Sequence, residues 1–351
     1  MTNISQPLIE WYSRNKRDLP WRETKKPYNI WVSEIILQQT RVNQGIDYYY
    51  RFIKKYPDLK SLASTHIDEL LKVWQGLGYY SRARNMHHTA QYLVNKNKGV
   101  FYSNYDDLIK LKGIGDYTAS AIASISFNQA TPVLDGNVYR VIARVYGIAE
   151  STQVKSGINK FKEILNKLIA HKNPGDFNQA IMEFGALQCV PKNPDCENCI
   201  IKSVCFAYNK GLISDLPVKK QKVKQKVRYF NYLHIIYNDN TFIEKRTEKD
   251  IWNSLYQFPL IETKKEYSLI ELQKNKDWLQ IFETLNLNIE KEVFTKKHIL
   301  SHQVLVACFY KIRIIQTTDF LINNYQSIPL AKLDIYSIPR LIEEYLEHIN
   351  K

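Results

Sequence analysis

The chain has 351 residues, enough for two domains of ordinary size, and 44% of them are hydrophobic against 24% charged. This composition can bury a sizeable core, and it excludes an intrinsically disordered protein. Lysine and arginine number 49 against 35 acidic residues. The net charge of +14 favours a polyanionic partner, either nucleic acid or an anionic membrane surface, although a generally basic proteome would give the same balance.

No apolar run approaches the length of a membrane span, and the first residues, MTNISQPLIEWYSR, contain no signal-peptide core. We therefore expect a cytoplasmic protein without a membrane partner. Four of the five cysteines are crowded between positions 189 and 205. In a reducing compartment, such crowding favours a metal site over disulfide bonds.

The first part of the chain, residues 1–212, is predicted to be helical. VSEIILQQTRV, which begins at Val32, has apolar residues at the spacing of a core-facing helix. IDELLKVWQGLGYYSRARN predicts another helix that breaks at Gly76 and Gly78. INKFKEILNKLIAHK predicts an amphipathic helix ended by the Asn-Pro-Gly of residues 173–175.

The character of the sequence changes after the clustered cysteines. ISDLPVKKQKVKQKVR is rich in basic residues and contains a proline, so residues 213–227 are predicted to form a linker. RYFNYLHIIYNDNTFIEKR then has two β-rich runs around an Asn-Asp-Asn turn, which predicts a hairpin. Residues 228–351 are expected to be a second domain of mixed α and β structure.

The clustered cysteines follow the pattern C-x6-C-x2-C-x5-C, and they are Cys189, Cys196, Cys199 and Cys205. Four thiolates this close can hold either a tetrahedral zinc ion or a cubane iron–sulfur cluster, but zinc ribbons usually pair two C-x2-C knuckles and this chain has one. The spacing resembles the [4Fe–4S] loop of the endonuclease III-like DNA glycosylases. Lys192, inside the loop, is a candidate phosphate contact. Cys308, in an apolar strand-like run, is expected to be a core thiol.

LKGIGDYTASAI contains the glycine pair Gly113 and Gly115. The pair lacks the Lys-Ser/Thr of a P-loop and the third small residue of a dinucleotide-binding turn, and it does not follow a predicted strand. A short helix-like DDLIKL precedes it and a small-residue helix follows, so we predict a helix–glycine hairpin–helix. Backbone N–H groups at the start of the second helix would bind a phosphate regardless of sequence, whereas the alternative is a simple turn between packed helices.

The order of these motifs resembles the helix-hairpin-helix base-excision glycosylase superfamily over residues 8–212. LPWR at 19–22, SEIILQQT at 33–40, GLGYYSRARN at 76–85 and LDGNV at 134–138 resemble its adenine DNA glycosylase branch. The resemblance implies a mainly α N-terminal helix-hairpin-helix domain with a [4Fe–4S] loop, followed by an α+β Nudix-like C-terminal domain.

The same resemblance implies a function in base excision repair. The implied enzyme is a monofunctional DNA glycosylase that flips out adenine mispaired with 8-oxoguanine or guanine in double-stranded DNA. It hydrolyses the N-glycosidic bond and leaves an abasic site. We expect it to act as a monomer associated with the nucleoid.

The candidate catalytic residues divide acid and stabilising work between two carboxylates. Glu34 lies among isoleucines and leucine, where a carboxylic acid keeps its proton near neutral pH, and the resemblance makes it the general acid on adenine N7. Asp135 is the matched carboxylate that stabilises the developing oxocarbenium ion, with Asn137 orienting groups near the sugar. Tyr117 stands where bifunctional relatives carry a lysine, and because a phenol cannot form an imine, no efficient lyase step is expected.

Other matched positions would contact the flipped base or fill its place in the duplex. Gln39 and Tyr79 are implied wedges, which Leu77 would assist, although ordinary packing is the alternative for each. The implied adenine pocket consists of Arg17, Trp21, Arg22, Leu37 and Gln179.

The C-terminal part resembles the Nudix-like domain that this branch uses to recognise 8-oxoguanine, and WNSLYQFP at 252–259 fits that region. The acidic REXXEE helix of Nudix hydrolases is absent, so we expect neither nucleotide hydrolysis nor a Mg²⁺ site. In LSH at 300–302, Leu300 replaces the usual phenylalanine, which weakens the expected stacking contact. Ser301 and His302 remain candidates for hydrogen bonds to the oxidised base.

Two other functions compete with this interpretation. An endonuclease III-like enzyme would excise oxidised pyrimidines with lyase activity, but Tyr117 and the additional C-terminal domain argue against it. A DNA-binding protein that uses the iron–sulfur fold only structurally is the non-enzymatic alternative. The presence of both Glu34 and Asp135 at matched positions argues against that second possibility.

Overall fold

A computed structural model of the chain describes residues 2–218, 225–283, 285–290 and 294–350. The chain divides into two compact units, Met1–Ser64 with Asn85–Gln221 and Thr65–Arg84 with Lys222–Lys351. The domain boundaries expected from the sequence stay predictions, and residues 219–224 of the predicted linker lie outside the described residues. None of the helices in the described ranges is long and apolar enough to cross a membrane.

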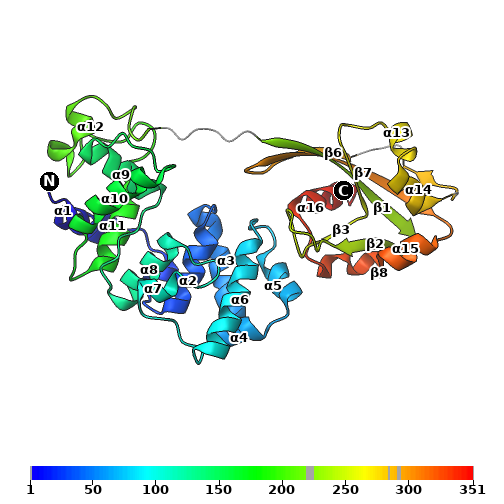
Figure 1. The fold of residues 1–351 in the computed structure, drawn as a ribbon, viewed down its shortest axis with the longest axis horizontal. Coiled ribbons are helices and arrows are strands. Elements are labelled where there is room, and N and C mark those ends of the chain that lie inside the picture. The colour runs from blue at the N-terminus through cyan, green and yellow to red at the C-terminus, as the bar shows by residue number, and fades with distance from the viewer. Residues whose placement is uncertain (1, 219–224, 284, 291–293, 351) are drawn as a thin grey trace. The chain divides into compact units, whose positions relative to one another are not determined.

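The first unit is built from helices, as the sequence predicts (Figure 1). They are α1 (Ser5–Asn15), η1 (Pro20–Arg22), α2 (Pro27–Leu37), α3 (Val42–Lys55), α4 (Leu59–Ser64), most of α6 (Ser81–Lys96), α7 (Tyr105–Leu108), α8 (Asp116–Phe127), α9 (Gly136–Tyr146), α10 (Lys155–Leu168), α11 (Pro174–Leu187), η2 (Lys202–Val204) and α12 (Phe206–Asn209). The helix α5 (Ile67–Trp74) belongs to the second unit.

Three of these helices form the centre of the first unit because small residues let them approach closely. The helix α8 is rich in alanine and serine and packs against both α2 and α11. A Cβ at Gly175 would lie 2.9 Å from the Cα of Ile125, and one at Gly185 would lie 2.7 Å from the Cβ of Asn137. Both glycines of α11 are therefore needed for its packing against α8 and α9.

The helix predicted from Val32 onward is correct in kind but ends earlier than its apolar pattern suggested. The helix α2 begins at Pro27, which is favourable in the first turn, and ends at Leu37. Gln39 has a φ of 60°, a left-handed conformation that a helix cannot continue through. The turn re-aims the chain into α3 and leaves Glu34 in the last turn of α2.

The glycine segment forms the predicted hairpin between α7 and α8. Gly113 has a φ of 80°, and a Cβ there would lie 2.5 Å from the Cβ of Asn85, so this position requires glycine. Gly115 has a φ of −89° and is the N-cap of α8, so its backbone conformation is open to other residues. The hairpin thus needs one of the two glycines for its shape.

The second unit contains an eight-stranded mixed sheet. Its strands are β1 (Lys226–Tyr237), β2 (Asn240–Lys245), β3 (Tyr256–Gln257), β4 (Leu260–Thr263), β5 (Asn288–Ile289), β6 (Phe294–Ile299), β7 (Gln303–Ile314) and β8 (Gln326–Pro329). The central strands β1 and β7 run parallel, from Lys226 opposite Gln303 to Tyr237 opposite Ile314. The predicted hairpin is present between β1 and β2, with Asn238 at a φ of 51° in its turn.

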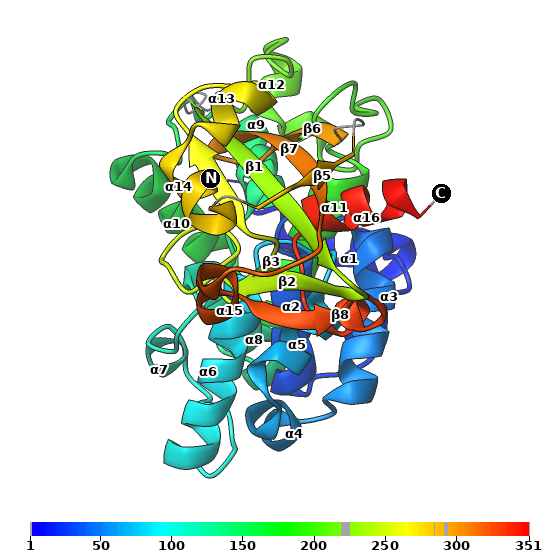
Figure 2. The same ribbon diagram turned by 90° about the vertical axis from the view of Figure 1, so that its right-hand side faces the viewer.

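Helices cover both faces of this sheet (Figure 2). Alternate side chains of β1 pack on opposite sides, Phe230 and Tyr232 with one core and Leu233 with the other. The helix α16 (Arg340–Ile349) and the turn η3 (Leu330–Ile335) lie against the first core. The helices α13 (Leu269–Gln273), α14 (Lys276–Phe282) and α15 (Asp319–Asn324) lie against the second. A sheet covered in this way agrees with the expected α+β domain.

Candidate active site

Glu34 is a buried acid of the first unit, with 8% of its surface exposed. Burial raises the pKa of its carboxyl to about 7, and a negative charge on Asp135 pushes the pKa the same way. A hydrogen bond with Tyr117 and the positive charge of Arg22 oppose this rise. Glu34 is therefore partly protonated near neutral pH, as a general acid must be.

Asp135 caps the N-terminus of α9. Its Oδ1 accepts the backbone N–H of Val138 at 2.7 Å, and its Oδ2 accepts a hydrogen bond from Asn137 Nδ2 at 3.0 Å. Burial raises the pKa of Asp135, whereas these hydrogen bonds lower it. The cap fixes the direction of the carboxylate, and its electrostatic coupling to Glu34 places the two acids in one site.

Tyr117 connects the hairpin to this site. It is the second residue of α8, directly after the glycine turn, and its hydroxyl donates to Met182 Sδ at 3.3 Å. Burial together with the negative charges of Glu34 and Asp135 raises the pKa of Tyr117 well above its usual value. The phenol thus stays neutral beside both carboxylates.

Asn137 joins the carboxylate of Asp135 to the cysteine loop. Arg140 Nη2 donates to Asn137 Oδ1 at 2.9 Å, and Arg140 Nε donates to the carbonyl oxygen of Cys189 at 2.7 Å. Arg140 is 9% exposed, so these bonds are shielded from water. The carboxylate of Asp135 is therefore linked to the cysteine loop through the side chains of Asn137 and Arg140.

Of the residues expected to form the adenine pocket, Arg17, Arg22 and Gln179 lie around α11 and the N-terminal segment, whereas Trp21 and Leu37 lie next to α3. Gln179 Oε1 accepts the hydroxyl of Tyr12 at 3.0 Å, and the guanidinium of Arg22 lies 5.3 Å from the ring centre of the same tyrosine. Trp21 is 7% exposed and packs edge-to-face on Tyr49. Leu37, the last residue of α2, is half-buried.

Glu183 was not singled out from the sequence. Its carboxylate is 1% exposed and forms salt bridges with Arg17 at 2.6 Å and with Arg22 at 2.8 Å. Burial alone would raise its pKa, but the hydrogen bonds from the two arginines outweigh burial and lower the pKa to about 2. The i, i+4 spacing from Gln179 on α11 is the signal that would have placed Glu183 on the face of the helix next to the pocket.

The three expected wedge residues differ in exposure. Gln39 is exposed in the turn after α2, and Tyr79 is 49% exposed with a φ of 47°. Leu77 is only 7% exposed. The packing alternative therefore describes Leu77 in this structure better than the wedge does.

Tyr79 and the LSH turn meet within the second unit. The segment 300–302 forms the tight connection between β6 and β7, and the Tyr79 hydroxyl lies 2.6 Å from Ser301 Oγ. His302 is exposed, whereas Leu300 is half-buried against the sheet core. These residues line one cavity together with Trp252, whose ring lies 5.9 Å from that of His298.

The loop that carries Tyr79 is held by two buried side chains that sequence analysis did not select. Arg82 Nη2 donates to the carbonyl oxygens of Leu77 and Gly78, each at 3.1 Å, and Trp74 Nε1 donates to Gly78 at 3.1 Å. Burial lowers the pKa of Arg82 to about 10. Both side chains belong to the segment Thr65–Arg84, and they fix the backbone directly before the tyrosine.

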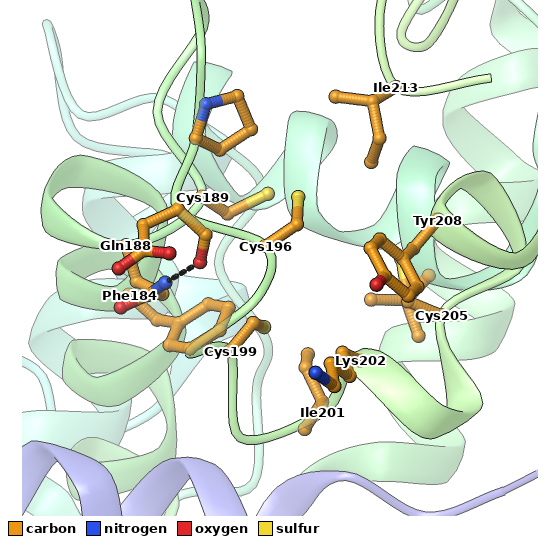
Figure 3. A pocket seen from close by; sticks show the side chains of 13 residues that line it. Phe184, Gln188, Cys189, Cys196, Cys199, Ile201, Lys202, Cys205, Tyr208 and Ile213 are labelled. Atoms are coloured by element: carbon orange, nitrogen blue, oxygen red, sulfur yellow. Dashed lines mark hydrogen bonds between the residues drawn. The ribbon is translucent and has the colours of Figure 1, made fainter. Parts of the chain in front are cut away.

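The four clustered cysteines line one cavity together with Val145 of α9 and Phe184 of α11 (Figure 3). No group of three or more Cys, His, Asp or Glu side chains in the described ranges is arranged to hold a single metal ion. Four thiols that line one cavity are a suitable donor set for a cubane cluster, in which each of four irons takes one thiolate. Burial raises the pKa of Cys199 to about 11, so the thiols need a metal to ionise.

Arg144 holds the cysteine loop in place. It is 2% exposed, and its guanidinium donates to Cys189 Sγ at 3.4 Å and to the carbonyl oxygens of Val190 and Leu216. These bonds fix the position of the loop at its first cysteine. Lys192 is exposed on the same loop, and Cys308 lies half-buried in β7.

Comparison with known proteins gives the relationship of the whole chain. Residues 32–167 match the HhH-GPD superfamily of base excision DNA repair proteins, and residues 231–348 match the NUDIX domain. Adenine DNA glycosylase of Buchnera aphidicola subsp. Acyrthosiphon pisum is 36% identical, over 99% of this chain and 98% of that protein. Adenine DNA glycosylase of Mus musculus is 42% identical over 62% of this chain and 44% of its own.

A solved structure of a thermostable thymine-DNA glycosylase is similar to the first part of the fold, with a TM-score of 0.55 and 28% identity over 59% of this chain and 95% of that one. The match to a NUDIX domain confirms the expected nature of the C-terminal part. Together with the near-complete coverage of the Buchnera protein, these findings assign the chain. It belongs to the adenine DNA glycosylase family, within the HhH-GPD superfamily of base excision DNA repair proteins, and is a DNA glycosylase.

Proposed function

We propose that this protein removes adenine that is mispaired with 8-oxoguanine, or less readily with guanine, and leaves an abasic site in double-stranded DNA. The observation that carries the proposal is the pair Glu34 and Asp135, two coupled carboxylates of which the first has a pKa of about 7. Adenine leaves poorly as an anion, so a protonated carboxyl at its N7 lowers the barrier. Curated relatives named adenine DNA glycosylase support adenine as the base.

The catalytic step follows from what each side chain can do. Glu34 donates its proton to the flipped adenine as the glycosidic bond lengthens. Asp135, held in one direction by the helix cap, stabilises the positive charge that develops on the sugar. Water then completes the hydrolysis at C1′, and because Tyr117 offers no amine, no imine forms on the sugar. The expected product is an intact strand with an abasic site.

We assign recognition of the base opposite the adenine to the second unit. Tyr79 and Ser301 share a hydrogen bond beside an open cavity, a site where hydroxyl groups can bond to an oxidised purine. His302 is exposed next to them and supplies a further donor or acceptor. Leu300 gives an apolar contact without aromatic stacking, so we expect weaker discrimination between 8-oxoguanine and guanine than a phenylalanine would give.

We assign binding of the DNA phosphate backbone to the hairpin and the cysteine loop. The open space around Gly115 leaves the N-terminus of α8 accessible to a phosphate, and the exposed Lys192 adds a positive charge. Gln39, exposed in the turn after α2, would enter the space left by the flipped base.

We further propose that the four cysteines hold a [4Fe–4S] cluster. The donor set consists of four thiols around one cavity, with Arg144 at the first of them, which suits a cluster. The cluster would tie the loop to α9 through Arg140, and its chemistry is not needed for base release. Iron and sulfide analysis should give about four of each per chain. Cys199→Ser should lose the iron, and a full iron content in that variant would contradict the ligand assignment.

The function is tested with three duplexes, which carry adenine opposite 8-oxoguanine, adenine opposite guanine, and an oxidised thymine. Strand breaks are scored with and without alkali, and the mass of the protein in solution is measured in parallel, because we expect a monomer. Breaks at adenine that appear only after alkali support the proposal. Cleavage at the oxidised thymine without alkali would indicate an endonuclease III-like enzyme, and binding without any base release would indicate a structural DNA-binding protein.

A further inference from the structure

Glu183 of α11 takes no part in the catalytic step proposed above. Five donors of two arginines converge on its carboxylate, all within 2.9 Å. On Oε1 these are the backbone N–H and Nε of Arg17 and Nη1 of Arg22, and on Oε2 they are Nη2 of each arginine. Such double bidentate pairing orients both guanidinium planes.

The carboxylate is well enclosed, and its partners are less so. Glu183 is 1% exposed, whereas the side chains of Arg22 and Arg17 are 12% and 36% exposed. Arg22 also donates to the carbonyl oxygen of Arg17 at 2.8 Å, which closes the cluster. The carboxylate is therefore shielded from water while the arginines are partly accessible, and Arg22 lies over the ring of Tyr12, whose hydroxyl donates to Gln179.

The net charge of this cluster affects the protonation of Glu34. The two arginines and one glutamate leave a net charge of +1 beside the acid. The positive charge of Arg22 lowers the pKa of Glu34, and so does the hydrogen bond with Tyr117 of α8, whereas the negative charge of Asp135 at the start of α9 raises it. Without the negative charge of Glu183, the field of the arginines at Glu34 would be stronger and would favour loss of its proton.

We propose that Glu183 is a positioning residue of the adenine pocket, which holds Arg22 in one orientation and offsets the arginine charge so that Glu34 keeps its proton. The inference rests on the proposed function, because it requires that adenine is the base and Glu34 the acid. It assigns to Glu183 an effect on the pH range of the reaction in addition to its effect on the shape of the pocket.

The test measures single-turnover release of adenine opposite 8-oxoguanine across the pH range for wild type, Glu183→Gln, Glu183→Asp and the double variant Arg17→Gln/Glu183→Gln. Glu183→Gln keeps the size of the side chain and removes its charge, so the alkaline limb of the rate profile should move to lower pH. A shift of one pH unit would appear as about a tenfold lower rate on that limb. Glu163→Gln, in an exposed pair with Lys167 on α10, is the matched control.

The other variants separate charge from structure. Glu183→Asp keeps the charge, so its alkaline limb should stay in place while the rate falls. The double variant restores the net charge of +1, so the alkaline limb of its rate profile should return toward the wild-type position. If the role of Glu183 were purely structural, the limb would not return. A limb that stays unmoved in Glu183→Gln, with the rate lowered equally at every pH, would overturn the inference.

Two further outcomes keep the test decisive. If Glu183→Gln does not fold, the other two variants still test the proposal. A shifted alkaline limb in Glu183→Asp would contradict the role of charge. So would an alkaline limb in the double variant that differs from that of wild type. If wild type itself releases no adenine, the proposed function fails, and with it the premise of the inference. The two failures are therefore distinguishable.

Discussion

Glu34 in α2 and Glu183 in α11 are both buried in the helical unit, yet their surroundings move their pKa values in opposite directions. Glu34 receives one hydrogen bond from a neutral phenol and faces another carboxylate, and its pKa rises to about 7. Glu183 receives five hydrogen bonds from two arginines, and its pKa falls to about 2. Burial by itself therefore does not make an acid catalyst, because the number and charge of the donors decide the protonation state.

The largest expected effect is the loss of chemistry in Glu34→Gln. The amide keeps the shape of the side chain but cannot donate the proton, so adenine release should fall by about 10²–10⁴-fold. Duplex binding should be unchanged, because the substitution leaves the DNA-contacting surface intact. Single-turnover rates and a binding titration on the same duplex check both expectations, and a variant with the full rate would contradict the role of Glu34.

The next largest effect is on stability. Replacement of Glu183, which is paired with two arginines, should lower the free energy of unfolding. Glu183→Gln leaves two arginines around a neutral amide, and breaking a buried ion pair costs about 3–5 kcal/mol in the free energy of unfolding. Urea unfolding at neutral pH measures this loss. The exposed control Glu163→Gln should change the same free energy by less than about 1 kcal/mol. A cost for Glu183→Gln as small as that of the control would show that its pairs contribute little.

The pH dependence of stability should have opposite signs at the two sites. Glu183, whose folded pKa lies below its ordinary value of 4.5, contributes stability above pH 4.5 that is lost as the pH falls toward 2. Glu34, whose folded pKa lies above 4.5, favours the folded state below pH 4.5 and loses that contribution as the pH rises through 7. Each shift corresponds to about 3 kcal/mol.

Glu34→Gln should therefore be more stable than wild type above the pKa of Glu34 and should lose that advantage in mild acid. Unfolding free energies of wild type and variant, measured at about pH 5 and about pH 8, give the sign directly. Equal differences at the two pH values would mean that Glu34 does not titrate abnormally in the folded protein.

The smallest effect concerns Tyr117, which tunes Glu34 without acting as the acid. Its hydrogen bond lowers the pKa of Glu34, so Tyr117→Phe should move the alkaline limb of the rate profile to higher pH, by less than about one unit. The rate below that limb should change little. A shift to lower pH would show that the phenol supports the proton on Glu34 instead of opposing it.

Much of the candidate site could be predicted because its parts lie in short motifs with local geometry. The cysteine spacing, the glycine hairpin and the Asp-Gly start of α9 each depend on neighbouring residues, and Asp135 caps a helix that begins at the next position. The apolar residues around Glu34 likewise indicated a protonated acid before any contact was known. The end of α2 was less predictable, because the left-handed turn at Gln39 overrides the periodic pattern.

The sequence by itself determined the family-specific chemistry: four cysteines in one loop, two carboxylates in separate motifs, and a phenol where an amine would give a lyase. The tertiary structure alone decided which distant groups meet. Glu183 lies 166 positions from Arg17 and Ser301 lies 222 positions from Tyr79, so neither pair leaves a local pattern. The pKa values of the two glutamates depend on such tertiary contacts, because electrostatic interactions depend on distance in space and on shielding from water.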